Sequence, residues 1–194
     1  MKRIVVGISG ASGAVYGVRL LEALRPMTDV ETHLIISDGG ATTLLHELDL
    51  KAADVQCLAD VVHDQRDLGA TIASGSFRVD GMVIAPCSIK VLSGIANCYD
   101  DNLLVRAADV RLKERQPLVL LVRETPLHRG HLRLMTLAAE AGAVIQPPVP
   151  SMYIRPQTID DLVDHTTMRV CDQLGIDTGF GTRWQGMTDG EDLG

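Results

Sequence analysis

The sequence predicts an α/β fold built on a doubly wound parallel sheet with helices on both faces. Short apolar runs of strand length alternate with segments of helical period, which is typical of βαβ units. Gly and Pro stand at the joints between these segments. No repeat, heptad pattern or linker divides the chain. We therefore predict one domain over residues 1–186, followed by an acidic C-terminal tail over 187–194.

The apolar patterns predict the elements in chain order. A strand over 3–8 leads into a Gly-rich turn and a helix over 14–25 that Pro26 ends. Four further strands are predicted, at 31–37, 81–86, 118–122 and 143–146. Helices are predicted between and after them, at 40–48, 88–96, 101–114, 130–141 and 158–174.

Composition limits the core and the class of protein. At 194 residues with 46% hydrophobic residues, the chain can bury a substantial core, which excludes intrinsic disorder. The chain has only two Phe, three Tyr and one Trp. The core is therefore predicted to consist of Val, Leu, Ile and Ala, and any aromatic side chain beside a ligand would be conspicuous.

Charge and cysteine usage narrow the partners and the compartment. Eighteen Lys and Arg against 25 Asp and Glu give a net charge of −7, which argues against nucleic acid or an anionic membrane as the main partner. No apolar run approaches the roughly 20 residues of a membrane-spanning helix. The four cysteines show no metal-binding or disulfide pattern. These features predict a cytoplasmic protein in which the cysteines, Cys57, Cys87, Cys98 and Cys171, are reduced thiols.

Residues that follow the strands are the candidate site, because such sheets bind ligands at the carboxyl ends of their strands. Residues 7–13 read Gly-Ile-Ser-Gly-Ala-Ser-Gly and open a helix. The N–H groups at the start of this helix could bind a phosphate. Alternatively, the segment is a tight strand-to-helix turn in which Ser12 caps the helix. Ser37 and Glu47 each fit an ordinary cap or helix charge. Cys87 is interpreted as a small buried thiol in preference to a nucleophile.

Basic residues follow the later strands. Ser88 and the N–H groups after it favour a second anion clamp. Arg106, Asp109 and Lys113 have the spacing of either a surface ion-pair ladder or a basic stripe facing an anion. The charged pair at 123–124 directly follows a predicted buried strand, which favours a functional role. For two further residues an ordinary structural role is the alternative to a functional one. Arg169 could be a snorkelling side chain, and Trp184 could be a packing or interface anchor.

These segments together resemble the UbiX-type flavin prenyltransferases, including relatives encoded beside non-oxidative aromatic-acid decarboxylases. The resemblance covers residues 1–186, nearly the whole chain. Its most specific part is RAADVRLKERQPLVLLVRETPL at 106–127. The other matching stretches are GASGAVYG (10–17), ASGSF (73–77), MVIAPCSIK (82–90), the Pro-rich turn ending in Tyr153, and RWQG (183–186).

The resemblance implies an activity, a cofactor and partners. It implies a metal-independent enzyme with a Rossmann-like, flavodoxin-type fold that binds reduced FMN. The enzyme would join the dimethylallyl group of dimethylallyl monophosphate to N5 and C6 of the flavin and release phosphate. The product, prenylated FMN, would serve a UbiD-type decarboxylase. The resemblance also implies a homo-oligomer, which in this family extends to dodecamers.

Residue roles carry over by matching position. FMN binding is implied for Gly10, Ala11, Ser12, Ser37, Ser88, Ile89, Lys90, Val91 and Arg106. Binding of the prenyl phosphate is implied for Lys113, Arg123, Tyr153 and Arg169. Proton handling is implied for Ser12, Glu47 and Glu124, and a place in the wall of the prenyl pocket for Trp184. Positive charge beside a leaving phosphate and an aromatic face beside an allyl cation agree with this chemistry.

The chain departs from the family at three informative positions. Leu68 stands where many members have a second pocket Trp, which favours the branch associated with aromatic-acid decarboxylases. Val91 stands where a Thr often contacts FMN. Leu134 and Arg133 replace the amide and the acid of an HLENM segment that reads HLRLM here. These changes bear on binding affinity more than on the class of reaction.

Two alternatives belong to other functional classes. An FMN-dependent decarboxylase of cysteine-containing substrates would share the fold, but the segment after Pro126 lacks the P-x-M-N-x-x-M-W pattern of those enzymes. A non-catalytic subunit that carries flavin for an aromatic-acid decarboxylase is the second alternative. The complete set of implied phosphate-binding residues argues against it, since a carrier would not need them.

Overall fold

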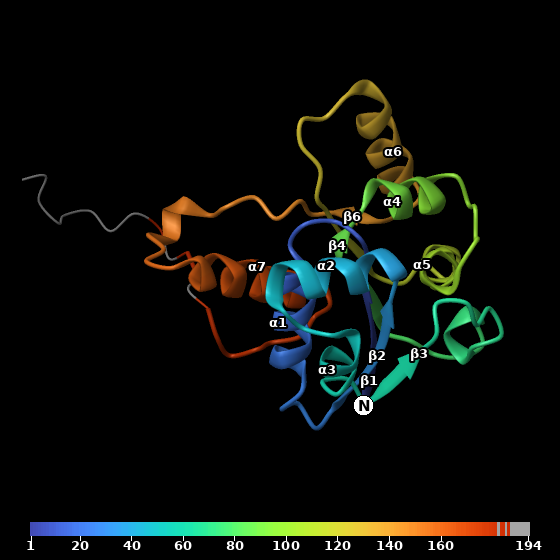
Figure 1. Cartoon of the computed structure of the whole chain (residues 1–194), viewed down its shortest axis with the longest axis horizontal. Coiled ribbons are helices and arrows are strands. Elements are labelled where there is room, and N and C mark those ends of the chain that lie inside the picture. The colour runs from blue at the N-terminus through green and yellow to red at the C-terminus, as the bar shows by residue number, and fades with distance from the viewer. Residues whose placement is uncertain (182, 185, 187–194) are drawn as a thin grey trace, which may run out of the picture.

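A parallel six-stranded sheet forms the centre of the computed structural model in Figure 1, which describes residues 1–181, 183–184 and 186. The strand order is β3-β2-β1-β4-β5-β6. The chain winds outward in both directions from the adjacent pair β1 and β4, which is the predicted doubly wound arrangement. The strands are β1 (Lys2–Ile8), β2 (Val30–Ile36), β3 (Val61–His63), β4 (Gly81–Cys87), β5 (Leu118–Val122) and β6 (Val144–Ile145).

Helices cover both faces of the sheet (Figure 1). One face packs against α1 (Ala14–Leu24), α2 (Asp38–Leu48), α3 (Ala52–Gln56) and α7 (Ile159–Gln173). The other face packs against α4 (Ile89–Ala96), α5 (Leu103–Lys113) and α6 (Arg129–Glu140). In the part of the chain that the structure describes, no helix has both the length and the apolar character needed to cross a bilayer.

Alternation along the strands divides the core into two clusters. In β1, Ile4, Val6 and Ile8 face the layer of α1 and α7, whereas Val5 faces the layer of α4 and α5. Both faces of the strand are therefore buried. This is why each central strand appears in the sequence as a continuous apolar run, without an alternation of apolar and polar residues.

Predicted and observed elements agree within two residues at each end. Four elements escaped prediction because each is too short to show a period: α3, β3, and the 3-10 helices Thr71–Ala73 and Met152–Ile154. The predicted acidic tail, 187–194, lies outside the described residues. The predicted aliphatic core is confirmed, since no aromatic side chain among the described residues is fully buried.

Gly40, in the first turn of α2, permits a close contact between α2 and β1. A Cβ added there would lie 2.3 Å from the carbonyl oxygen of Ile8, a backbone atom that cannot rotate away. The absence of a side chain therefore lets the start of α2 rest directly on the end of β1.

We expect Gly40→Ala to lower the free energy of unfolding by about 1–3 kcal/mol, the usual cost of overpacking. Alanine favours helix by itself, so a loss must come from this contact. The control is Gly69→Ala, where the new methyl group meets only the Asp67 side chain at 3.3 Å. Urea unfolding of both variants tests this, and equal midpoints would contradict it.

Candidate active site

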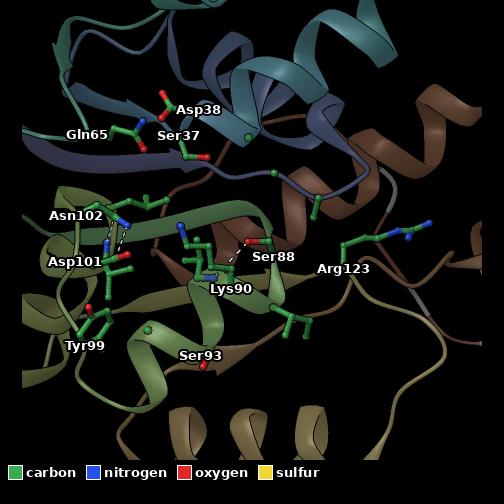
Figure 2. A pocket seen from close by; sticks show the side chains of 18 of the residues that line it. Ser37, Asp38, Gln65, Ser88, Lys90, Ser93, Tyr99, Asp101, Asn102 and Arg123 are labelled. Carbon is green, nitrogen blue, oxygen red and sulfur yellow. Dashed lines mark hydrogen bonds between the residues drawn. The ribbon is translucent and has the colours of Figure 1, made fainter.

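A cavity of about 1110 Å³ lies at the carboxyl ends of the central strands. It spans the β1–β4 junction, where the strand order reverses and where sheets of this type bind ligands. Figure 2 shows Ser88 and Lys90 in its middle, with Arg123 at the end opposite Asp101 and Asn102. Ten predicted site residues line it: Gly10, Ala11, Ser12, Ser37, Ser88, Ile89, Lys90, Val91, Arg123 and Glu124.

Ser9, a fully buried residue, joins the two loops that form the middle of this cavity. Its hydroxyl donates to the carbonyl oxygen of Pro86 at 2.7 Å and accepts the backbone N–H of Ser88 at 2.8 Å. Pro86 has no N–H for the sheet ladder, and the β4–β5 register shifts between Ile84 and Cys87. The Ser9 hydrogen bonds therefore fix the start of α4 against the end of β1.

Ser37 and Ser88 cap the helices that begin at the cavity. The Ser37 oxygen accepts the N–H of Gly40 at 3.0 Å, and the Ser88 oxygen accepts the N–H of Val91 at 3.4 Å. Each hydroxyl keeps its own hydrogen for a ligand. Two helix N-termini and two hydroxyl donors thus line one cavity, which is an arrangement suited to an anion.

The charged residues that line the cavity are two cations, Lys90 and Arg123, and three carboxylates, those of Glu124, Asp38 and Asp101. Within the described part of the chain, neither Lys90 nor Arg123 forms a salt bridge, so both cations are available to a ligand. Glu124 lies next to Arg123, and its Oε1 accepts the N–H of Thr125 at 3.0 Å. The cavity therefore offers cations for a phosphate and a carboxylate for proton transfer at the end of β5.

Glu47 of α2 caps α1, and Ser12 does not. The first cap position of α1 is Gly13, with φ of 100° and no side-chain cap of its own. Glu47 Oε2 accepts the N–H groups of Gly13 and Ala14 at 2.9 and 3.0 Å. The alternative in which Ser12 caps the helix is therefore wrong. Ser12 lines the cavity and hydrogen-bonds the Glu47 carboxylate from that side.

The environment of Glu47 keeps it ionised. Partial burial raises the pKa of its carboxyl, but hydrogen bonds from Ser12, Ala14 and Gly13, together with the positive charge of Arg123, outweigh burial. The net pKa is lower than usual. A group with a lowered pKa in the folded state stabilises the protein above its unfolded pKa, and this stabilisation disappears as the pH falls through the folded value.

Glu47→Gln should therefore flatten the acid end of the stability profile. The wild-type protein gains stability from Glu47 above about pH 4.5, the ordinary carboxyl value, and loses it below. The variant starts less stable at neutral pH and loses less on acidification. Urea unfolding at neutral pH and at about pH 3.5 measures the difference. Glu140→Gln, at an exposed carboxylate of α6, is the control and should follow the wild-type profile.

A second cavity, of about 320 Å³, lies between β6 and α7. It contains two of the predicted phosphate-binding residues, Tyr153 and Arg169. The Trp184 ring stands edge-on to Tyr153, with 5.7 Å between ring centroids. The structure thus brings Tyr153 together with Trp184 beside a cavity that Arg169 also lines, whereas Arg123, predicted to bind the same phosphate, lines the larger cavity.

Asp172 of α7 forms ion pairs with two arginines beside this second cavity, Arg169 and Arg183. Its carboxylate accepts two bonds from Arg183, at 2.9 and 3.1 Å, and one from Arg169 at 2.9 Å. The Arg183 guanidinium holds the pKa of the Asp172 carboxyl below its usual value, with further help from Arg169. Because Trp184 follows Arg183, this ion pair anchors the segment that carries the Trp.

Arg106 and Lys113 line neither cavity of the single chain. Arg106 donates to Asp100 and Asp109, each at 3.0 Å, and Lys113 pairs with Glu114 at 2.5 Å. Of the ion-pair ladder weighed for this helix, the Arg106–Asp109 pair is observed, whereas Lys113 pairs with Glu114. The remaining predicted site residue, Glu47, lies outside both cavities and reaches the larger one through its hydrogen bond to Ser12.

Sequence reasoning missed the wall opposite Arg123. Gln65 follows β3, and its carbonyl oxygen accepts the N–H of Leu103 at 2.7 Å. The rule that strand ends carry site residues would have found Gln65 had the three-residue β3 been recognised. Asp38, Tyr99, Asp101 and Asn102 also line the cavity. Their only signal is position in loops and first turns beside predicted site residues.

The departures from the family lie in different environments. Val91 lines the larger cavity and is 5% exposed, so it offers the ligand an apolar surface. Leu134 packs against the core under α6. Leu68 is 51% exposed on a loop and lines neither cavity.

Cys87 is a structural thiol. It is fully buried at the end of β4, and burial raises the pKa of its thiol to about 12. Burial likewise raises the pKa of the Cys171 thiol to about 12. A nucleophile must be a thiolate at neutral pH, so the interpretation of Cys87 as a small buried side chain agrees with the structure.

Two of the four thiols should react in the folded protein. Cys57 and Cys98 are exposed, whereas Cys87 and Cys171 are buried. Titration with an aromatic disulfide reagent at pH 8 should release two equivalents quickly and all four in denaturant. The double variant Cys57→Ser/Cys98→Ser should show no fast phase. A fast phase in that variant would contradict the assignment of Cys87.

Comparison with known proteins agrees with this geometry. The family model described as Flavoprotein matches residues 1–171, so the fold and site define a flavoprotein. The chain is 63% identical over 188 residues to the flavin prenyltransferase UbiX of Escherichia coli K12, covering 96% of this chain and all of that protein. This chain belongs to the UbiX flavin prenyltransferases, which confirms the expected family.

Solved structures agree as well. The structure of AnUbiX (PadA1) in complex with FMN and dimethylallyl pyrophosphate matches with a TM-score of 0.94 and 48% identity, over 96% of this chain and 99% of that chain. A dodecameric FMN-dependent UbiX-like decarboxylase from Escherichia coli O157:H7 matches with a TM-score of 0.93 and 49% identity, over 95% and 100%. The expected flavodoxin-like fold class is confirmed.

Proposed function

We propose that this protein joins the dimethylallyl group of dimethylallyl monophosphate to reduced FMN and releases phosphate. The observation that carries the proposal is the larger cavity, in which two helix N-termini, Lys90, Arg123 and Glu124 converge. The full-length similarity to UbiX flavin prenyltransferases supports it. When bound, reduced FMN supplies two nucleophilic ring atoms, N5 and C6, for bond formation with the dimethylallyl group.

The residues of the larger cavity suit FMN in size and chemistry. Its volume of about 1110 Å³ slightly exceeds the roughly 300–1,000 Å³ typical of ligand pockets, which leaves room for a flavin nucleotide. Backbone N–H groups and the hydroxyls of Ser37 and Ser88 suit phosphate or ring-edge oxygens, and Val91, Leu104 and Val105 offer apolar surface to a flat ring. We propose that the stretches 10–12 and 88–91 and the side chain of Ser37 hold the flavin.

Arg123, which lines the larger cavity, and Tyr153 and Arg169, which line the smaller one, are proposed to hold the prenyl phosphate together. Cleavage of the allylic C–O bond increases negative charge on the leaving phosphate. Fixed cations and a hydroxyl stabilise that charge as it grows, which is often the largest contribution to catalysis. Trp184, beside Tyr153, is proposed to face the allyl group, where a cation–π contact is worth about 0.5–2 kcal/mol.

Proton transfer is proposed to use Ser12, Glu47 and Glu124. Ring closure at C6 requires loss of a proton from that carbon, which needs a base within hydrogen-bonding reach. Glu124 lines the cavity directly. Glu47 is held ionised behind Ser12, so the Ser12 hydroxyl can pass a proton toward a carboxylate. The Glu124 route lies after β5, and the route through Ser12 to Glu47 lies after β1.

The deciding experiment is anaerobic incubation of the protein with reduced FMN and dimethylallyl monophosphate, followed by mass measurement of the flavin. We expect a gain of one five-carbon unit, and an unchanged mass would refute the proposed function. A parallel reaction with dimethylallyl pyrophosphate identifies the preferred donor. Cysteine-containing peptides are offered to test the decarboxylase alternative, which predicts release of carbon dioxide.

Glu124→Gln should reduce turnover by about 100-fold or more, the usual contribution of a positioned acid or base. FMN affinity should stay at the wild-type value, because the isosteric amide keeps the shape of the cavity. Single-turnover assays and FMN titration measure the two quantities. Glu140→Gln is the control. Undiminished turnover in Glu124→Gln would show that its assigned role is wrong.

The product is proposed to serve a UbiD-type decarboxylase, since the reaction consumes a free flavin and releases a modified one. The non-catalytic carrier remains the alternative, and it predicts FMN binding without a gain in mass. We also propose that the protein works in the cytoplasm, where its four unpaired cysteines stay reduced.

Oligomerisation is proposed to complete the phosphate site. Arg106 and Lys113 lie outside the cavities of their own chain, and α6 and its flanks expose Leu127 and Leu132. A similar structure is dodecameric. We propose that this chain forms a homo-oligomer, as large as a dodecamer, in which Lys113 reaches the prenyl phosphate, and Arg106 the FMN, of a neighbouring copy.

Subunit complementation tests this arrangement. Lys113→Ala and Glu124→Gln should each be nearly inactive alone. When the two variants are co-expressed in one cell, they form mixed assemblies in which an intact Lys113 on one copy meets an intact Glu124 on another. We expect partial recovery of turnover in these assemblies. No recovery in assemblies shown by mass spectrometry to be mixed would place both residues in one copy.

A further inference from the structure

Tyr153 is an exposed residue whose ring meets Trp184 edge-on and whose hydroxyl reaches α7. It lies in the three-residue 3-10 helix Met152–Ile154, on the orange connection that extends from the body of the molecule before α7 (Figure 1). Tyr153 is 53% exposed. A Tyr on such a short element samples several rotamers unless a contact fixes it, and fixing it only on ligand binding would cost affinity.

His165 of α7 supplies that contact. The Tyr153 Oη lies 2.8 Å from Nε2 of His165, and the two rings meet edge to face with 5.5 Å between centroids. His165 is 3% exposed, so its own position is set by the packing of α7. The hydrogen bond thus transfers the rigidity of the helix to an exposed phenol.

The same face of α7 carries the neighbouring cation. His165 and Arg169 are four residues apart, so they lie one above the other on the helix, and both line the smaller cavity. The guanidinium of Arg169 is held in turn by Asp172, whose carboxylate accepts from it at 2.9 Å. Such a fixed pair of donors suits a phosphate, whose oxygens accept from several sides.

We propose that His165 is a positioning residue, which donates its Nε2–H to the Tyr153 oxygen so that the phenol hydrogen is left for the prenyl phosphate. The proposal rests on the proposed function, in which Tyr153 binds that phosphate. A phenol has one hydrogen. If that hydrogen were given to His165, Tyr153 would present only lone pairs to an anion and would repel it. Donation from His165 also polarises the phenol into a stronger donor.

A matched pair of amides tests the role of Nε2. In His165→Gln the side-chain nitrogen reaches about as far as Nε2, whereas in His165→Asn it stops near the Nδ1 position. Each protein is loaded with oxidised FMN, so that no turnover occurs, and titrated calorimetrically with dimethylallyl monophosphate. We expect His165→Asn to raise the Kd about tenfold, and His165→Gln to stay within about threefold of wild type.

A double-mutant cycle separates positioning from a general structural effect. Tyr153→Phe should raise the Kd about as much as His165→Asn does, and adding His165→Asn to Tyr153→Phe should change it no further. In turnover assays with reduced FMN, His165→Asn should raise KM with little change in kcat. FMN affinity and the thermal midpoint are measured first. If His165→Asn disturbs either, His165→Leu, of similar volume, replaces it in the cycle.

Three results would overturn the proposal. The first is a wild-type Kd in His165→Asn, and the second is a Kd raised equally in His165→Gln and His165→Asn. The third is a double variant whose Kd rises by the product of the two single-variant factors. Each differs from failure of the proposed function. If the wild-type protein adds no five-carbon unit to reduced FMN, the function fails whatever His165 does. If the wild-type protein is active but His165→Asn binds the prenyl phosphate normally, the function stands and only the positioning role is lost.

Discussion

The Ser9 hydroxyl holds the larger cavity in shape. With a single oxygen it donates to Pro86 and accepts from Ser88, so the ends of β1 and β4 are tied at the point where the sheet reverses its winding. Both loops leave this junction, one toward α1 and the other toward α4. In a fully buried position, a lost partner would leave an unpaired polar group, which costs about 1–3 kcal/mol. The geometry of both cavity loops therefore depends on one residue.

The distribution of charge separates cations that stabilise the fold from cations left for ligands. Arg106 and Lys113 are paired with carboxylates of their own chain, whereas Lys90 and Arg123 form no ion pair among the described residues. An acidic protein with a net charge of −7 thus keeps two unpaired cations in a cavity that Asp38, Asp101 and Glu124 also line. Exposed pairs such as Lys113 with Glu114 are worth little and can exchange partners, which is compatible with a second role across a subunit boundary.

The C-terminal region brings together features that a single sheet edge could not supply. Helix α7 packs against α1 on one face, and it presents His165, Arg169 and Asp172 around the smaller cavity. Asp172 anchors Arg183, and with it the neighbouring Trp184 beside Tyr153. Few aromatic residues remain for the core, because half of the six aromatic side chains are exposed, and two of these meet here. Aromatic scarcity is thus a property of the site as much as of the core.

The sequence by itself determined the doubly wound fold, because buried parallel strands need continuous apolar runs and the joints need Gly and Pro. It also located the loops after β1, β2, β4 and β5, since parallel strands end at one edge. Only the tertiary structure decided that Glu47 caps α1, that Gln65 reaches the cavity, and that His165 meets Tyr153. The physical reason is distance along the chain: Glu47 lies 34 residues from the Gly13 N–H that it accepts. Such contacts depend on how helices dock on the sheet, which no local pattern encodes.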